Sequence, residues 1–183
     1  MAKWAVRAAF LTNGLIVGAL YSRIPDFKAE LGLSNGQVGT VLLCSSVGVL
    51  LMISQVGKWC AVKGSKPIVI LSSYISAFTI LPLAVAKSFP TLCASFLVWG
   101  AFLTMQDVSM NAHATTVEHV EQRRYMSGFH GVFSIGALFG GFIGGLCSQY
   151  GISILKQNLG ISIYFIILAT LVKNWWLPAQ SDI

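Results

Sequence analysis

Residues 126–148 read MSGFHGVFSIGALFGGFIGGLCS and contain no aspartate, glutamate, lysine or arginine. A helix that crosses the hydrocarbon core of a bilayer needs about 20 mostly apolar residues. Every backbone polar group must be satisfied internally in lipid, so this stretch is predicted to be a transmembrane helix. Its glycines Gly136, Gly140 and Gly144 recur at every fourth residue. That spacing lets two helix backbones approach closely and predicts a packing surface.

Five further apolar stretches of similar length lie on either side of this one, each bounded by charged or polar residues. We predict them at about residues 8–24, 37–56, 67–86, 91–112 and 157–172. Ser34 and Gln37 have the spacing of a capping box at the start of the second stretch. The last stretch is short, and Trp175 and Trp176 extend it towards an interfacial aromatic belt. The predicted fold class is therefore an all-α membrane protein, with residues 1–183 as a single unit of six transmembrane helices.

The overall composition agrees with a membrane environment. The chain is 55% hydrophobic and only 10% charged, whereas soluble domains carry roughly 25% charged residues. The net charge is +6, but the basic residues are scattered between apolar stretches, so the expected partner is the lipid bilayer and not nucleic acid. The four cysteines form no C-x-x-C pair, and we expect neither a metal site nor a cofactor.

The distribution of lysine and arginine predicts the orientation of the helices. With the N-terminus inside, the cytoplasmic side holds eight basic residues and the outer side holds four. Loops rich in lysine and arginine stay in the cytoplasm, so both termini are expected there. The cytoplasmic set is Lys3, Arg7, Lys58, Lys63, Lys66, Arg123, Arg124 and Lys173, and the outer set is Arg23, Lys28, Lys87 and Lys156.

A repeated segment suggests that the chain contains two copies of a three-helix unit. Residues 9–12 and residues 101–104 both read AFLT, at an offset of 92. The same offset relates three pairs of glycines: Gly36 and Gly128, Gly39 and Gly131, Gly48 and Gly140. Three is an odd number of spans, so the second copy would be inverted in the membrane, as in many transporters. The alternative is a chance match between apolar sequences.

Several motifs resemble the N-terminal half of major facilitator superfamily transporters. They are Asn13-Gly14, SRIP at 22–25, LGLS at 31–34 and QVG at 37–39. The stretches DVSMNA at 107–112 and MSGFHG at 126–131 are similar to helices four and five of the superfamily's fucose-permease-like bacterial branch.

This resemblance implies a six-helix half of a twelve-helix carrier in a bacterial inner membrane. The implied function is transport of a small polar solute by alternating access. It requires a second six-helix half, either a separate chain or a second copy. The fifth helix of such carriers faces the other half, so the glycine stripe of Gly136, Gly140 and Gly144 is expected at the edge of an open face.

The segment between the second and third helices resembles the superfamily's loop signature only in part. Gly57, Gly64 and Lys66 match the signature's two glycines and its final lysine. Ala61 and Val62 stand where the signature has aspartate and arginine. The intracellular charge lock that this pair implies is therefore not expected here.

Four polar residues within the predicted spans are candidates for a substrate or proton pathway. Asp107 is the one acidic residue inside a span, and Asn111 follows it by one helical turn on the same face. His130 lies one turn into the next helix, at a similar depth, and an Asp–His pair can hold a proton near neutral pH. Asn13 lies in the first helix, where the resemblance implies a substrate cavity. The alternative for each is a structural role in helix packing or loop attachment.

Catalysis is the weaker alternative to transport. Ser127 and His130 resemble a hydrolase pair only superficially, because the G-x-S-x-G elbow and a third orienting group are missing. We therefore predict no catalytic residues and no enzyme activity. A non-transporting scaffold or a remnant of a larger carrier also remains open, although a scaffold has no need of Asp107 in a membrane span.

Overall fold

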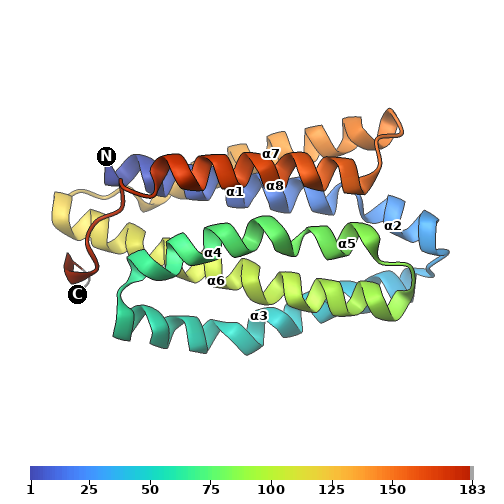
Figure 1. The fold of residues 1–183 in the computed structure, drawn as a ribbon, viewed down its shortest axis with the longest axis horizontal. Helices are drawn as coiled ribbons and strands as arrows, with labels where there is room; N and C mark the ends of the chain where they lie inside the picture. Colours follow the sequence, from blue (N-terminus) through green and yellow to red (C-terminus); the bar gives the residue numbers. More distant parts are fainter. Residues whose placement is uncertain (182–183) are drawn as a thin grey trace.

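The structure is a computed structural model that describes residues 1–181, and all regular structure in that range is helical (Figure 1). Six segments are long and apolar enough to cross a membrane, as predicted. Two of them are broken into shorter helices, so the elements are α1 (Ala2–Tyr21), α2 (Ile24–Leu31), α3 (Asn35–Lys63), α4 (Ser65–Thr79), α5 (Leu81–Val85), α6 (Phe89–Glu121), α7 (Met126–Gln149), α8 (Ile154–Val172) and the short 3-10 turn η1 (Ala179–Ser181).

Proline explains both breaks. Pro25 and Pro82 each lie in the first turn of the shorter helix that follows the break, α2 and α5 respectively. Proline lacks a backbone N–H and disfavours continuation of the preceding helix, so the chain turns and restarts at these positions. The sequence prediction ended the first span at about residue 24, close to the first break, but treated 67–86 as one helix and missed the second.

The observed helices are longer than predicted at several ends. The first begins at Ala2 instead of residue 8, and the fourth continues to Glu121 instead of stopping at residue 112. Charges mark where a helix leaves the hydrocarbon, but a helix ends only where its backbone is interrupted. α6 stops at Gln122, which has a left-handed conformation with φ of 51°. The predicted capping box at the start of α3 is confirmed by reciprocal bonds between Ser34 and Gln37.

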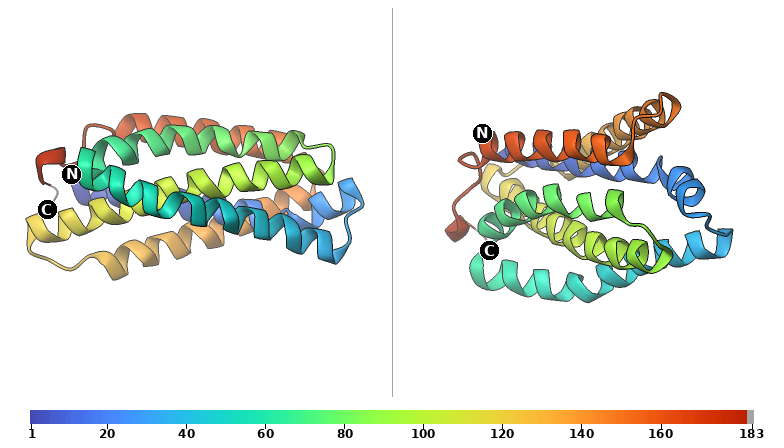
Figure 2. Two further views of the ribbon diagram at one scale, coloured as in Figure 1. Left: turned by 90° about the horizontal axis from the view of Figure 1, so that it is seen from below. Right: turned by 45° about the vertical axis from the view of Figure 1, so that its right-hand side comes forward.

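Two parallel helix pairs form the frame of the bundle, α1 with α7 and α3 with α6 (Figures 1 and 2). In both pairs glycines remove the side chains at the crossing. A Cβ added at Gly18 would lie 2.0 Å from the carbonyl oxygen of Ala137, and one added at Gly100 would lie 2.2 Å from the carbonyl oxygen of Ser45. Both helix pairs are therefore in direct backbone contact.

These contacts reveal the true register of the internal repeat. Ala137 and Ser45 are 92 positions apart, as are Gly140 and Gly48, which confirms that α3 corresponds to α7 at the predicted offset. Gly18 and Gly100, however, are 82 positions apart, so α1 corresponds to α6 at a different offset. The match between residues 9–12 and 101–104 is thus a chance similarity of apolar sequence, although the pairing of the helices is right.

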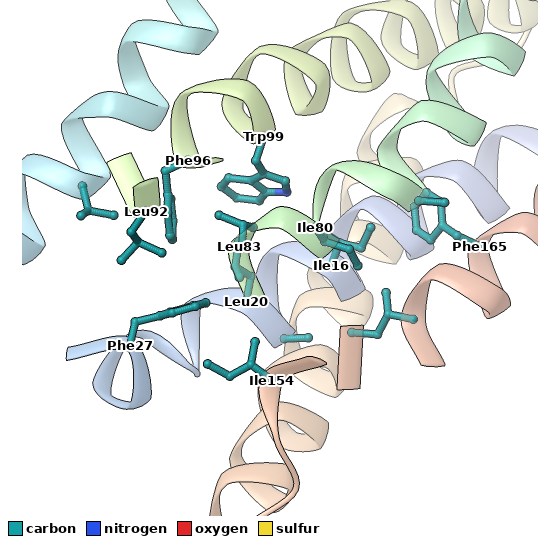
Figure 3. Packing of buried hydrophobic residues seen from close by; sticks show 14 of the residues in the cluster. Ile16, Leu20, Phe27, Ile80, Leu83, Leu92, Phe96, Trp99, Ile154 and Phe165 are labelled. Atoms are coloured by element: carbon teal, nitrogen blue, oxygen red, sulfur yellow. The ribbon is translucent and has the colours of Figure 1, made fainter. Parts of the chain in front are cut away.

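Corresponding helices of the two repeats run in opposite directions along the bundle (Figure 1). The N-terminus and the last described residues lie together at one end, which we call the terminal end. An aromatic cluster fills the core near the opposite end, where Phe96 contacts both Phe27 and Trp99 edge to face (Figure 3). A second cluster at the terminal end contains Phe10, Phe129 and Trp176.

The prediction for the two tryptophans at the end of α8 is half wrong. Trp175 is exposed, as an interfacial residue should be, but only 4% of the surface of Trp176 is exposed. The chain turns back after Val172 and inserts Trp176 into the core at the terminal end. The sequence shows two adjacent aromatic residues and does not show this turn.

Candidate functional site

Asp107 and Asn111 lie on the face of α6 that the rest of this chain leaves open. Asp107 is exposed and Asn111 is half-buried. The Nδ2 of Asn111 donates hydrogen bonds to the backbone oxygen of Asp107 at 2.8 Å and to its carboxylate Oδ1 at 3.3 Å. The one-turn spacing expected from sequence therefore becomes a physical contact, in which the amide fixes the orientation of the carboxylate.

His130 lies on the exposed side of α7 and within electrostatic range of Asp107. The edge of its ring packs against Phe10 of α1, with ring centroids 5.3 Å apart and planes at 86°. Phe10 is fully buried and holds the imidazole at the surface of the bundle. Asp107, Asn111 and His130 together form what we call the polar set.

Further hydroxyl groups extend the polar set along both helices. Thr115 on α6 follows Asn111 by one turn, and Ser127 and Ser134 lie within one turn of His130 on α7. All three are exposed, and two of them bond to backbone oxygens of their own helix, Thr115 to Asn111 and Ser134 to His130. The spacing of three or four residues was a usable signal for them, which the sequence prediction did not exploit.

Asn13 does not join the polar set in this structure. Only 3% of its surface is exposed, and its Nδ2 lies 4.0 Å from the sulfur of Met110 on α6. Its position is therefore inside the interface between α1 and α6. Successive residues of a helix point in directions about 100° apart. Whether a side chain faces a cavity or an interface therefore depends on where the neighbouring helix lies, which the sequence does not show.

The glycine stripe of α7 packs against α1, not at the open face where it was expected. A Cβ added at Gly136 or Gly140 would lie 2.1 Å from the carbonyl oxygen of Leu11 or Leu15 respectively. At Gly144 the added atom would lie 2.0 Å from the hydroxyl of Ser22. The expectation of an unfilled groove along this stripe is wrong, because the first helix of the same chain fills it.

The partial loop signature proves to be mostly helical. α3 continues through Gly57 to Lys63, and the whole connection to α4 is Gly64, whose φ of 81° breaks the helix. Lys66 is half-buried in the first turn of α4, and Gly57 has open space around it. Gly64 thus has a conformational reason for being glycine, which Gly57 lacks.

A buried charged cluster near the opposite end was missed at the sequence level. Arg23 was counted as an outer loop charge, yet only 3% of its surface is exposed. Its guanidinium forms an ion pair with Asp26 and donates to Gln157 Oε1 at 3.1 Å and to the Ile152 oxygen at 2.8 Å. Ser148 donates to the same Asp26 at 2.8 Å. The cluster ties the α1–α2 break to α8 and to the α7–α8 turn.

A buried histidine, also missed, joins three segments at the terminal end. The Nδ1 of His113 lies 2.7 Å from the hydroxyl of Ser65, and the backbone N–H of Leu177 donates to its Nε2 at 3.1 Å. The ring also meets Trp176 edge to face. His113 therefore fastens the start of α4 and the segment after α8 to α6. A histidine in an apolar stretch was a visible signal, but its partners were not.

The described residues contain no group of three or more side chains arranged to hold a metal ion.

Comparison with known proteins agrees with the helical architecture and the membrane-spanning segments. Residues 8–180 match the model of the Major Facilitator Superfamily. An uncharacterized MFS-type transporter of Yersinia pestis is 36% identical over 137 residues, which cover 74% of this chain and 35% of that protein. The membrane protein MosC of Rhizobium meliloti is 31% identical over 178 residues, which cover 97% of this chain and 42% of that protein.

The chain belongs to the Major Facilitator Superfamily, and it is a multi-pass membrane protein. An uncharacterized transporter of Sinorhizobium fredii is 28% identical over 135 residues, which cover 74% of this chain and 36% of that protein. The chain thus spans between about a third and two fifths of the curated relatives that it matches.

Proposed function

We propose that this chain acts as the N-terminal half of a secondary transporter that moves a small polar solute by alternating access. The observation that carries the proposal is the polar set of Asp107, Asn111 and His130, which lies within membrane-spanning helices and yet is open to the outside of the bundle. A bare carboxylate in hydrocarbon costs at least about 2.5–3.5 kcal/mol. A second half that encloses a wet cavity removes this cost.

The exposure of α3 and α7 supports the need for a second half. In each of these two helices 17% of the apolar 18-residue segment that would cross the membrane is buried. The corresponding share is 56% for the first span and 50% for the third. Large apolar side chains such as Leu50 and Leu138, each 72% exposed, project from them. The second half is a separate chain, a second copy of this chain, or the remainder of a longer polypeptide.

Within the superfamily the motifs at 107–112 and 126–131 favour the fucose-permease-like bacterial branch. The proposed location is the bacterial inner membrane with both termini in the cytoplasm. Both ends of the described chain lie at the same end of the bundle. The excess of eight basic residues over four supports this orientation. Labelling of cysteines placed at Ser181 and Ser88 in intact cells tests this orientation, and outside labelling at position 181 would refute it.

We propose further that Asp107 and His130 share the coupling proton, with Asn111 orienting the carboxylate. Asp107→Asn should abolish proton-driven accumulation and leave exchange of solute intact, with the second half supplied. Glu30→Gln is the matched control, because Glu30 is an exposed acid outside the polar set. Unchanged accumulation in the Asp107 variant would leave this residue with a structural role only.

The two alternatives are a non-transporting scaffold and an intramembrane enzyme. Neither explains an exposed carboxylate within a span as directly as an incomplete transport cavity does. We therefore propose no enzyme activity, no catalytic residue and no cofactor.

A further inference from the structure

A long apolar groove runs between α7 and α8, with α1 as its floor. It consists of two cavities of about 640 and 620 Å³ that share Leu11 and Tyr164 in their walls. The groove therefore continues from one cavity into the other. Along α8 its walls include both Lys156 and Val172, which at 1.5 Å per residue are roughly 24 Å apart. This is most of the hydrocarbon thickness of about 30 Å.

The shape and the lining of the groove indicate what suits it. Its walls are mainly apolar side chains, and its length is most of the hydrocarbon thickness. The groove therefore suits extended hydrocarbon chains that lie along it.

The two ends of the groove carry positive charge. Arg7 lines it at the terminal end and Lys156 lines it near the opposite end, and the lining contains no acidic side chain. The guanidinium of Arg7 is held over the ring of Trp4, 4.5 Å from the ring centroid. Within residues 1–181 no carboxylate lies at ion-pair distance from Arg7. Its charge is therefore available to an anionic ligand.

Aromatic residues place this cation at the membrane surface. Trp4 and Trp175 both line the groove at the same end as Arg7 and are both exposed. Exposed tryptophans concentrate at the level of the lipid head groups. A basic side chain at that depth, at the mouth of an apolar groove, has the chemistry of a phospholipid site.

We infer that the α1–α7–α8 groove is a binding site for an anionic phospholipid, whose phosphate contacts Arg7 and whose acyl chains lie along the groove. The site lies apart from the polar set and does not depend on the proposed transport function. It also does not depend on which end of the bundle faces the cytoplasm.

Native mass spectrometry of the purified chain in detergent, titrated with palmitoyl-oleoyl phosphatidylglycerol or phosphatidylcholine, tests the head-group contact. We expect the anionic lipid to bind the native chain more tightly than the zwitterionic one. Arg7→Gln should weaken phosphatidylglycerol binding about fivefold and remove the preference, and Arg7→Lys should keep most of it. Arg124→Gln is the control, since it removes the same charge from an exposed loop at the same end. Equal binding of both lipids by the native chain, or equal loss in both Gln variants, would overturn the inference.

A second pair of variants tests the acyl-chain path. Gly160 lines the groove and Gly145 does not, and an added Cβ meets nothing within 4 Å at either position. Gly160→Phe should block the groove and reduce bound lipid of both kinds, whereas Gly145→Phe should leave lipid binding unchanged. Circular dichroism confirms that each variant is folded. Full lipid binding by folded Gly160→Phe, or a disulfide-linked dimer formed efficiently through Tyr164→Cys, would show that lipid does not occupy the groove.

Discussion

The two three-helix repeats cross in the same way but close differently around their third span. In both, a glycine contact joins the frame helices, Gly48 to α6 and Gly140 to α1. The third span of the first repeat, α4, then packs on α6 through buried polar groups in the middle of α4. The corresponding contact of the second repeat is that of α8 with α1, and there the long groove separates α8 from α7 above α1.

Hydrogen bonding accounts for the difference. Gln106 of α6 accepts from Ser72 at 2.6 Å and from Ser73 at 3.2 Å, both in the middle of α4. On the other side, the bond from Arg23 reaches Gln157, at the beginning of α8. In the middle of α8 the buried Ser162 bonds to α4 and not to a frame helix. Hydrogen bonds of the described residues therefore attach the middle of α4 to the frame, whereas they attach α8 to the frame only near its beginning. A shared repeat therefore fixes the crossing of the frame helices and not the position of the third span.

The largest effect is expected where the two repeats are alike. Gly48→Leu and Gly140→Leu each force a side chain against a backbone oxygen only 2.1 Å from the added Cβ. Inserting extra atoms into a packed core costs about 1–3 kcal/mol when neighbouring side chains can move aside. The backbone of a packed helix can move less than a side chain, so the cost here is larger. We expect each variant to lose more than about 3 kcal/mol in the free energy of unfolding, measured by detergent-denaturant titration followed by circular dichroism.

The control for this prediction is a pair of glycines on the same two helices, α3 and α7. Gly39 and Gly131 are also 92 positions apart, and an added Cβ at either meets nothing within 4 Å. Leucine at these positions should change the stability by no more than about 0.5 kcal/mol. A large loss for one crossing glycine and a small loss for its counterpart would show that the two crossings are not equivalent.

An intermediate effect is expected where the repeats begin to differ. Gln157→Leu leaves the buried guanidinium of Arg23 without one of its acceptors, and a hydrogen bond to a charged group contributes about 1.5–3 kcal/mol. Gln106→Leu removes two neutral bonds, each worth about 0.6 kcal/mol in membranes. The stability should therefore fall by about 2 kcal/mol for the first variant and about 1 kcal/mol for the second. The reverse order in the same titration would mean that the end contact of α8 is the weaker of the two attachments.

The sequence predicted the six spans because each is a separate apolar stretch, and it predicted the correspondence of α3 with α7 from glycines at a fixed offset. It could not predict contacts that depend on which helices become neighbours. Asn13 was a candidate for a cavity or for helix packing and lies against Met110, and the stripe at Gly140 was expected at an open face and packs on Leu15. Both cases concern the neighbour of a helix face, which is tertiary information.

In the candidate site, too, the sequence predicted contacts within one helix and not contacts between helices. The spacing of Asp107 and Asn111 fixes their contact, because both are on one helix. His130 was matched to them only by depth, and its proximity to Asp107 depends on how α6 and α7 pack. Arg23 was misjudged for a different reason: its burial requires Asp26, Gln157 and the turn at Ile152 to converge, and these lie in two regions far apart in the sequence.

The smallest effect, and the sharpest test of the open groove, comes from adding the same side chain to both third spans. Ser72 is fully buried against α6, so Ser72→Leu overpacks the closed interface and removes the bond to Gln106. That change should cost about 2 kcal/mol. Gly160 faces the groove with open space around it. Gly160→Leu therefore meets no obstacle, and it replaces a residue that disfavours helices by roughly 0.5–1 kcal/mol. We expect its stability to equal or exceed that of the native chain by up to about 1 kcal/mol. If the groove instead closed in the membrane, so that α8 packed as tightly as α4 packs on α6, the two substitutions would be equally costly, and the contrast between the repeats would belong to the isolated chain alone.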